Sequence, residues 1–267
     1  MVSPSGNMFA CEFVAQHIDS VARYIIGTAA ALSNDFDYAE QLLLDSEKRL
    51  NQVLQQTKAA PISVLLATVQ RRIGELYFIR LQRLIDQYTS RRDMESLCDA
   101  EAMIDKLQVY DPGNYSGHLC RAICAFMLRR NLDEARREIE ACRKTHDSAW
   151  MYSEAFLHAY DGDLQNAYRS YRNAFQAPLQ DPTVPIQSEE FIQIVLDQEP
   201  NRPWLYYCTG LINYRAKRDL ASARADFRNF VERSDAVGFG TQIAIAKQWI
   251  HEIDALLNAH RDTEHNA

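Results

Sequence analysis

The polar and apolar residues of this chain recur with the period of an α-helix over most of its length. Apolar residues at every third or fourth position predict amphipathic helices of about four turns. Four such stretches are residues 20–32, 116–129, 149–160 and 203–216. A short polar corner and a second helical pattern follow each one. The sequence therefore predicts pairs of antiparallel helices, or helical hairpins.

The second helix of each pair opens in the same way. An apolar or aromatic residue follows the corner, then an alanine, and then a bulky residue four positions beyond the alanine. The alanines are Ala39, Ala135, Ala167 and Ala223, and the bulky residues are Leu43, Ile139, Tyr171 and Phe227. A small side chain lets two helix backbones approach, and we expect the bulky residue to fill the gap between hairpins. Ala135 and Ala167 lie 32 positions apart (167 − 135 = 32), which indicates a repeat.

This series resembles the tetratricopeptide repeat, a helix-turn-helix unit of about 34 residues with small and aromatic residues at fixed offsets. The matching residues are Gly27, Ala39 and Leu43; Ala100, Ile104 and Pro112; Phe126, Ala135 and Ile139; Gly162, Ala167, Tyr171 and Ala174; and Trp204, Gly210, Tyr214, Ala223 and Phe227. The resemblance implies an all-α fold, a right-handed superhelix (α-solenoid) of about five antiparallel helical hairpins.

The repeat pattern divides the chain into segments. We expect an N-terminal extension or the start of the first helix in residues 1–19, the repeat array in 20–234, a capping helix in 235–260 and a tail in 261–267. Within the array, residues 176–202 predict an insertion whose short helix begins at Ser188. Residues 61–90 have the pattern of one long helix, so the second hairpin (61–110) has either an extended first arm or an inserted turn.

The Asp-Gly-Asp sequence at residues 161–163 could be a metal loop, a catalytic carboxylate pair or a corner between helices. A calcium loop requires glycine at its sixth position, where Asn166 stands. We expect Gly162 to take a conformation that is awkward for other residues and Asp163 to cap the next helix. The sequence thus favours a corner.

Metal-binding and catalytic patterns are weak. One set of residues has a spacing that superficially suits a zinc site: Cys120, Cys124, Cys142 and His146. The repeat register places these side chains on different faces, so we expect the cysteines to be buried free thiols. His158 is expected to be an interhelical histidine, because the pattern sets no nucleophile or carboxylate beside it. Neither a serine elbow nor a phosphate-binding glycine run occurs. The sequence predicts no cofactor and no catalytic residue, with an enzyme lacking a recognisable motif as an alternative.

The resemblance implies that the first helix of each hairpin lines a concave groove. The aromatic residues expected there, and predicted to bind a partner, are Tyr24, Tyr152, Phe156, Tyr160, Tyr207 and Tyr214. Three of them stand four positions apart on one helix and form a stripe. Two interpretations remain open: these rings bind the hydrophobic anchors of a protein or peptide, or they pack against neighbouring hairpins or the inserted helix.

Composition and charge narrow the functional classes. The chain has 267 residues, of which 47% are hydrophobic and 24% charged, with a net charge of −7. That charge disfavours nucleic acid and anionic membranes as partners. The N-terminus lacks the basic region of a secretory signal, so we expect a cytoplasmic protein.

The sequence predicts a non-catalytic scaffold or adaptor for a protein or peptide. The alternative is a regulatory or sensory module that binds a small ligand or acts beside a catalytic chain. The oligomeric state is left open.

Overall fold

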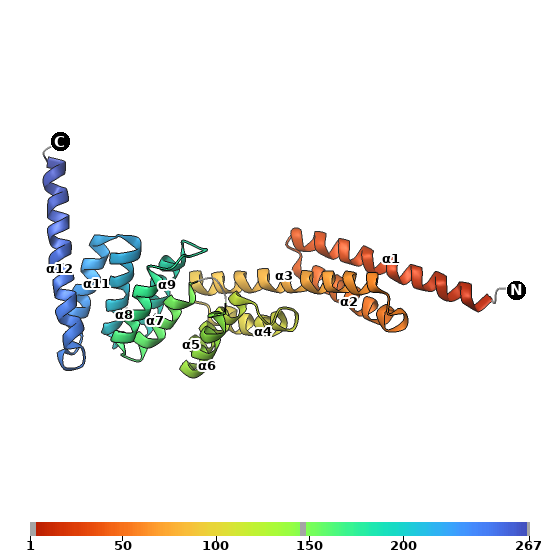
Figure 1. The fold of residues 1–267 in the computed structure, drawn as a ribbon, viewed down its shortest axis with the longest axis horizontal. Helices are drawn as coiled ribbons and strands as arrows, with labels where there is room; N and C mark the ends of the chain where they lie inside the picture. The colour runs from red at the N-terminus through yellow and green to blue at the C-terminus, as the bar shows by residue number, and fades with distance from the viewer. Residues whose placement is uncertain (1–3, 145–147, 266–267) are drawn as a thin grey trace. The chain divides into compact units, whose positions relative to one another are not determined.

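The computed structural model describes residues 4–144 and 148–265, with side chains described for 17–144 and 148–259. Every regular element in these ranges is a helix (Figure 1), which confirms the predicted all-α fold. The chain forms two compact units, Met1–Arg130 and Asn131–Ala267. Among the described helices, none combines the length and the apolar character needed to cross a membrane.

Unit 1 contains five helices, each packed on the one before it in the chain. They are α1 (Pro4–Leu32), α2 (Phe36–Thr57), α3 (Ala60–Arg91), α4 (Met94–Tyr110) and α5 (Tyr115–Arg129). The first helix begins at Pro4, so the segment before residue 20 is the start of this helix. Helix α3 runs unbroken for 32 residues. The second hairpin therefore has an extended arm and no inserted turn.

Unit 2 contains the remaining elements. They are α6 (Leu132–Cys142), α7 (Trp150–Tyr160), α8 (Leu164–Ala174), α9 (Val184–Gln198), the 3₁₀ turn η1 (Pro203–Leu205), α10 (Tyr206–Leu211), the π-helix η2 (Ile212–Lys217), α11 (Leu220–Arg233) and α12 (Ala236–His265). Helices α7 and α8 form one hairpin. The continuous run from η1 to η2 pairs with α11 to form another, and α12 packs on α11 as a final helix. Helix α12 extends to His265, so residues 261–265, expected in the tail, continue it.

Five corners between successive helices of the described residues share one backbone form. A residue with a positive φ, between 52° and 83°, is followed at once by the Asp or Asn that caps the next helix. The positive-φ residues are Asn34, Arg92, Arg130, Gly162 and Arg218. Each cap side chain accepts a hydrogen bond from a backbone N–H in the first turn, which satisfies a donor that the helix cannot.

The Asp-Gly-Asp sequence is one of these corners, as predicted. Gly162 has a φ of 83°. The Asn166 N–H donates to Asp163 Oδ1 at 3.1 Å, and this bond holds the pKa of the Asp163 carboxyl below its usual range. The Asp163 carboxylate therefore caps the N-terminus of α8.

The four aligned alanines occupy equivalent places. Each is the fourth residue after its cap, and its amide donates to the carbonyl oxygen of that cap at 3.0–3.1 Å. Ala39, Ala135, Ala167 and Ala223 are at most 1% exposed. Ala100 differs, because the fourth residue after the Asp93 cap is Leu97 and Ala100 lies about one turn further along. The alignment of Ala100 with the other alanines is corrected accordingly.

Two of the bulky residues after these alanines, Leu43 and Phe227, pack against a glycine of their own hairpin. A Cβ added to Gly27 would lie 3.1 Å from Leu43 Cγ, and one added to Gly210 would lie 2.6 Å from the Phe227 ring. Since Leu43 and Phe227 are fully buried, neither can move aside freely. The paired helices approach so closely because glycine faces a large side chain.

The inserted helix α9 begins at Val184, four residues before Ser188, which does not cap it. Pro185 lies in its first turn, where a missing N–H costs no helical hydrogen bond. Helix α9 packs on α7, α10 and η2, which are the first helices of the two hairpins in unit 2. It buries Ile192, Val195 and Leu196.

Gly210→Ala should destabilise the protein by about 1–3 kcal/mol, because the new methyl group would overlap the buried Phe227 ring. Chemical denaturation measures this change. Gly240→Ala is the matched control, since nothing lies within 4 Å of its added Cβ. Equal stability of the two variants would show that the first and second helices of this hairpin do not meet at Gly210.

Candidate functional site

The six aromatic residues predicted to line a groove are mostly buried. Tyr152, Phe156, Tyr160, Tyr207 and Tyr214 are exposed by only 1–7%, while Tyr24, on α1 in unit 1, is half-buried. Of the two interpretations that the sequence left open, this structure has the one in which the rings pack against neighbouring helices. Their binding to a partner stays a prediction.

Tyr152 belongs to the inside of its own hairpin. Its ring lies 6.0 Å from those of Tyr171 and Phe175, on and just after α8, in edge-to-face arrangements. Burial raises the pKa of Tyr152 to about 12. This ring fixes α7 against α8.

Phe156 and Tyr160 lie against the inserted segment. The ring of Phe156 meets Phe191 of α9 edge to face, with 5.0 Å between the centroids. The Tyr160 hydroxyl donates to Glu199 at 2.9 Å, and the Arg202 guanidinium lies 3.8 Å from the Tyr160 ring centroid. Helix α9 and the residues after it thus cover this part of the stripe, which is the packing on the inserted helix that the sequence left as one of two interpretations.

Tyr207 and Tyr214 lie where the last hairpin meets α12. Trp249 of α12 stacks on Tyr207, with centroids 5.9 Å apart, and Phe227 lies 5.2 Å from Trp249. The Tyr214 hydroxyl donates to Glu252 at 3.2 Å. These two tyrosines hold the final helix against the hairpin.

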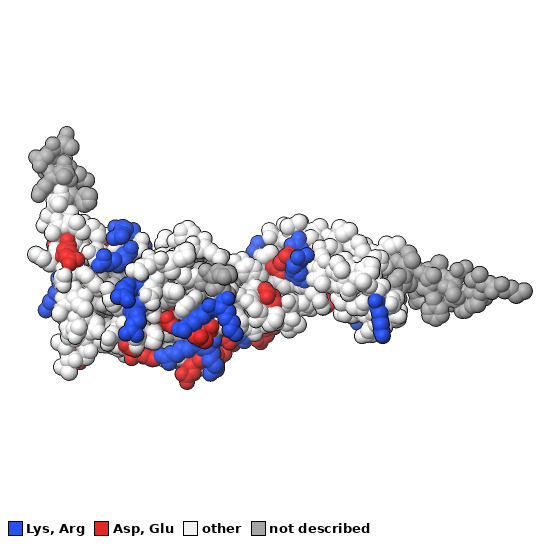
Figure 2. All heavy atoms as spheres, in the orientation of Figure 1, with Lys and Arg blue, Asp and Glu red and all other residues white. Residues whose placement is uncertain are grey.

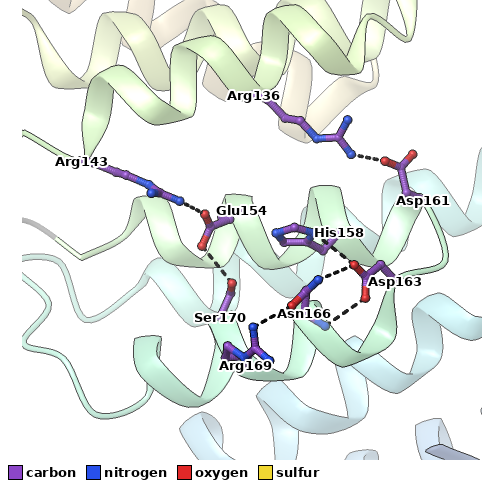
Figure 3. Close-up of polar contacts among 9 residues, drawn as sticks. All are labelled: Arg136, Arg143, Glu154, His158, Asp161, Asp163, Asn166, Arg169 and Ser170. Carbon is purple, nitrogen blue, oxygen red and sulfur yellow. Dashed lines mark hydrogen bonds and ion pairs between the residues drawn. The ribbon is translucent and has the colours of Figure 1, made fainter.

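A cleft of about 180 Å³, lined by charged residues and by Ile139 and Leu157, lies between α6 and α7. Figure 3 shows Arg136 and Arg143 reaching across it from α6 and the end of that helix, towards Asp161 and Glu154. His158 lies beside them, with its Nδ1 3.8 Å from Asp163 Oδ2. Because each arginine already has a carboxylate partner, the cleft has no unbalanced charge for a charged ligand.

Figure 2 shows that charged side chains are unevenly spread over this face of unit 2. Near α6, basic and acidic side chains lie next to one another, whereas beside α11 a run of basic side chains has few acidic ones around it.

The described residues include no group of three His, Cys, Asp or Glu side chains that could hold a metal ion. Burial raises the pKa of both Cys124 and Cys142 to about 12, so these thiols keep their protons. The fourth residue of the zinc-like spacing, His146, lies outside the described residues.

A buried polar cluster joins α9 to the last hairpin, and sequence reasoning missed it. Asn213, in the π-helix η2, donates from Nδ2 to Glu189 of α9 at 2.7 Å and to Asp226 of α11 at 2.9 Å. Lys217 forms an ion pair with Glu189. Asn213 is fully buried. The one local feature that marks the Asn213 cluster is the π-helix η2 that contains Asn213. π-Helices often occur at functional positions.

Burial raises the pKa of Asp226 in this cluster to about 6. Two carboxyl groups, Asp226 and Glu189, share one amide donor, and the nearby Glu189 charge also raises the pKa of Asp226. The cluster therefore contains a carboxyl group that changes charge near neutral pH, at the contact that holds α9.

Comparisons with known proteins do not identify a family for this chain. No protein-family model and no curated protein matches the sequence. Among solved structures, a tetratricopeptide repeat protein from Parabacteroides merdae ATCC 43184 is similar, with a TM-score of 0.33 and 15% identity. The match covers 85% of this chain and 98% of that chain. A score this low does not establish a common fold.

Asp226→Asn should stabilise the protein at pH 7.5 by about 1–2 kcal/mol and have little effect at pH 4. The folded state keeps the Asp226 proton up to about pH 6, whereas the model value for this carboxyl is 3.8, so folding becomes less favourable as the pH rises between these values. Denaturation at both pH values measures the difference.

Asp254→Asn is the control for this experiment. The Arg224 hydrogen bond lowers the pKa of Asp254, so its substitution should bring no gain at pH 7.5. A loss of stability in the Asp226 variant at pH 7.5 would contradict the assignment of a costly buried charge.

Proposed function

We propose that this protein is a non-catalytic scaffold whose helical hairpins bind an amphipathic helix of a partner protein. The observation that carries the proposal is the position of α9 on α7, α10 and η2. An amphipathic helix is thus already accommodated on the face of the first helices. Recognition of a helix by an apolar face is a common mode of protein binding.

The contacts of α9 indicate the chemistry of the partner helix. Phe191 meets Phe156, and Ile192, Val195 and Leu196 are buried, which together form an apolar stripe. In the second turn of α9, Glu189 accepts a hydrogen bond from Asn213 and pairs with Lys217. A partner would present an aromatic or aliphatic anchor in place of Phe191 and an acidic residue in place of Glu189.

Helix α9 would act as an internal competitor for the same face. It is joined to α8 by residues 175–183 and to η1 by residues 199–202, which contain no helix. Because it is covalently attached, its effective concentration is high, and a partner binds only to the fraction of molecules in which α9 has left. The aromatic residues predicted from the sequence, Phe156 and Tyr160, would then form the exposed face.

A small-ligand module is the weaker alternative. The cleft between α6 and α7 measures about 180 Å³, below the roughly 300–1,000 Å³ of common ligand pockets. Its arginines are paired with carboxylates. These features give a ligand few free polar groups.

A labelled synthetic peptide of residues 183–199 provides a direct test. Phe191→Ala weakens the hold of α9 by removing the ring contact with Phe156, so the full-length variant should bind the peptide about tenfold more tightly than wild type. Fluorescence anisotropy measures this affinity, and faster proteolysis within residues 184–198 reports release of α9.

Two further variants make the test specific. Ile186→Ala, at a position that is 44% exposed on the same helix, should leave peptide binding unchanged. Adding Phe156→Leu to the Phe191 variant should reverse the gain while preserving most of the buried volume. Released α9 without any gain in peptide binding would contradict the proposed function.

A further inference from the structure

Helix α1 carries an apolar stripe that the rest of unit 1 leaves uncovered. The stripe consists of Ile18, Ala22, Ile25, Ala29 and Leu32, which we call the α1 stripe. Its large members are 61%, 59% and 75% exposed in chain order. In Figure 2 the described part of α1 presents an uncharged surface in this view.

The opposite face of α1 is already packed against α2. The Ser46 hydroxyl donates to the Ser20 carbonyl oxygen at 2.8 Å, and Gly27 lies against Leu43. Helix α1 is therefore apolar on two faces and covered on only one. A helix that is hydrophobic on both sides is ordinarily buried on both.

Exposed apolar residues are not a general feature of the helices in unit 1, as the neighbouring helix α2 shows. The exposed positions of α2 are mainly polar, and they include Asp37, Gln41, Lys48 and Gln52. The apolar surface is specific to α1.

The spacing of the stripe is that of a coiled-coil seam. Its members alternate by four and three positions, an average period of about 3.5 residues, which lets two helices stay in contact along their length. In the sequence, Met8, Cys11 and Ala15 continue the same spacing towards the N-terminus. A seam of this kind is covered by another helix.

The order of side-chain sizes makes the stripe complementary to itself. In an antiparallel pair with a two-fold axis between residues 22 and 25, Ala22 faces Ile25 of a second copy and Ile18 faces its Ala29. Every large side chain then meets a small one, as close packing requires. A parallel pair would place alanine opposite alanine and isoleucine opposite isoleucine. Layers with gaps between the two helices would then alternate with overcrowded layers.

A membrane surface fits the stripe less well. Helices that lie on anionic lipid use Lys or Arg beside the apolar face. In the described part of α1, Arg23 is the one Lys or Arg, and it pairs with Asp19 and Asp45, each at 3.1 Å. The stripe has apolar anchors without the flanking positive charge.

We propose that the α1 stripe is a homodimer interface, in which α1 packs antiparallel on the α1 of a second copy of this chain. The contact is isologous, so it closes at two chains and does not propagate into fibres. It is independent of the α9 face in unit 2. A dimer would carry that face twice, and a partner with two matching helices would gain avidity.

Sedimentation velocity on the full chain tests this interface. Wild type should sediment with twice the chain mass, and Ile25→Glu with the mass of one chain, because two charges would be placed in the apolar seam. The circular dichroism of the variant should stay unchanged, since Ile25 is 59% exposed. Val109→Glu, at an exposed apolar position on α4, is the control and should remain dimeric.

Mixing two variants tests the antiparallel arrangement. Ala22→Glu and Ile25→Lys should each be monomeric alone, and the mixture should regain the dimer mass, because residue 22 of one chain meets residue 25 of the other. In a parallel pair neither new charge would find its partner. A mixture that stays monomeric overturns the antiparallel interface.

Two other outcomes overturn the proposal as a whole. One is a wild-type chain that is monomeric at the highest soluble concentration, including a monomer that co-sediments with phosphatidylserine–phosphatidylcholine vesicles. The other is a dimer that survives Ile25→Glu, which would place the interface elsewhere.

Discussion

The fold depends on a corner that is repeated five times. A left-handed residue ends one helix, and the next Asp or Asn caps the following helix with its side chain. In four of these second helices the fourth residue after the cap is a buried alanine. Three of the left-handed residues are arginines, although that conformation costs a non-glycine residue about 1–2 kcal/mol. The packing of the hairpin must outweigh that cost.

The sequence predicts the features that depend on residues close together in the chain, and it does not predict the contacts between distant segments. Four of the corners, the alanines that follow them and the left-handed Gly162 depend on residues a few positions apart, and the sequence predicts them. The corner at Arg92 and the place of Ala100 were not predicted, because the long helix α3 obscures the repeat register there. The neighbour of each aromatic face depends on distant segments. A helical period shows that Phe156 and Tyr160 share a face, but not that Phe191 and Glu199 cover it. The Asn213 cluster joins three separate helices and leaves no pattern along the chain.

The two surfaces inferred to bind other molecules differ in their present state. The face of α7, α10 and η2 carries α9, held by an apolar contact and by a polar cluster with a carboxyl group that titrates near pH 6. The α1 stripe is uncovered within its unit. The proposals for the two surfaces differ accordingly: exchange between an internal helix and a partner at the first, and assembly of the chain with itself at the second.

The most direct test of this account is the unfolding free energy of Ala167→Leu. Ala167 is fully buried at the fourth position after the Asp163 cap, so a larger side chain there should force α7 and α8 apart and lower the stability by about 1–3 kcal/mol. Ala221→Leu, at an exposed position of α11, should change it little. An unchanged unfolding free energy for Ala167→Leu would mean that the small residue after the corner does not set the approach of the paired helices.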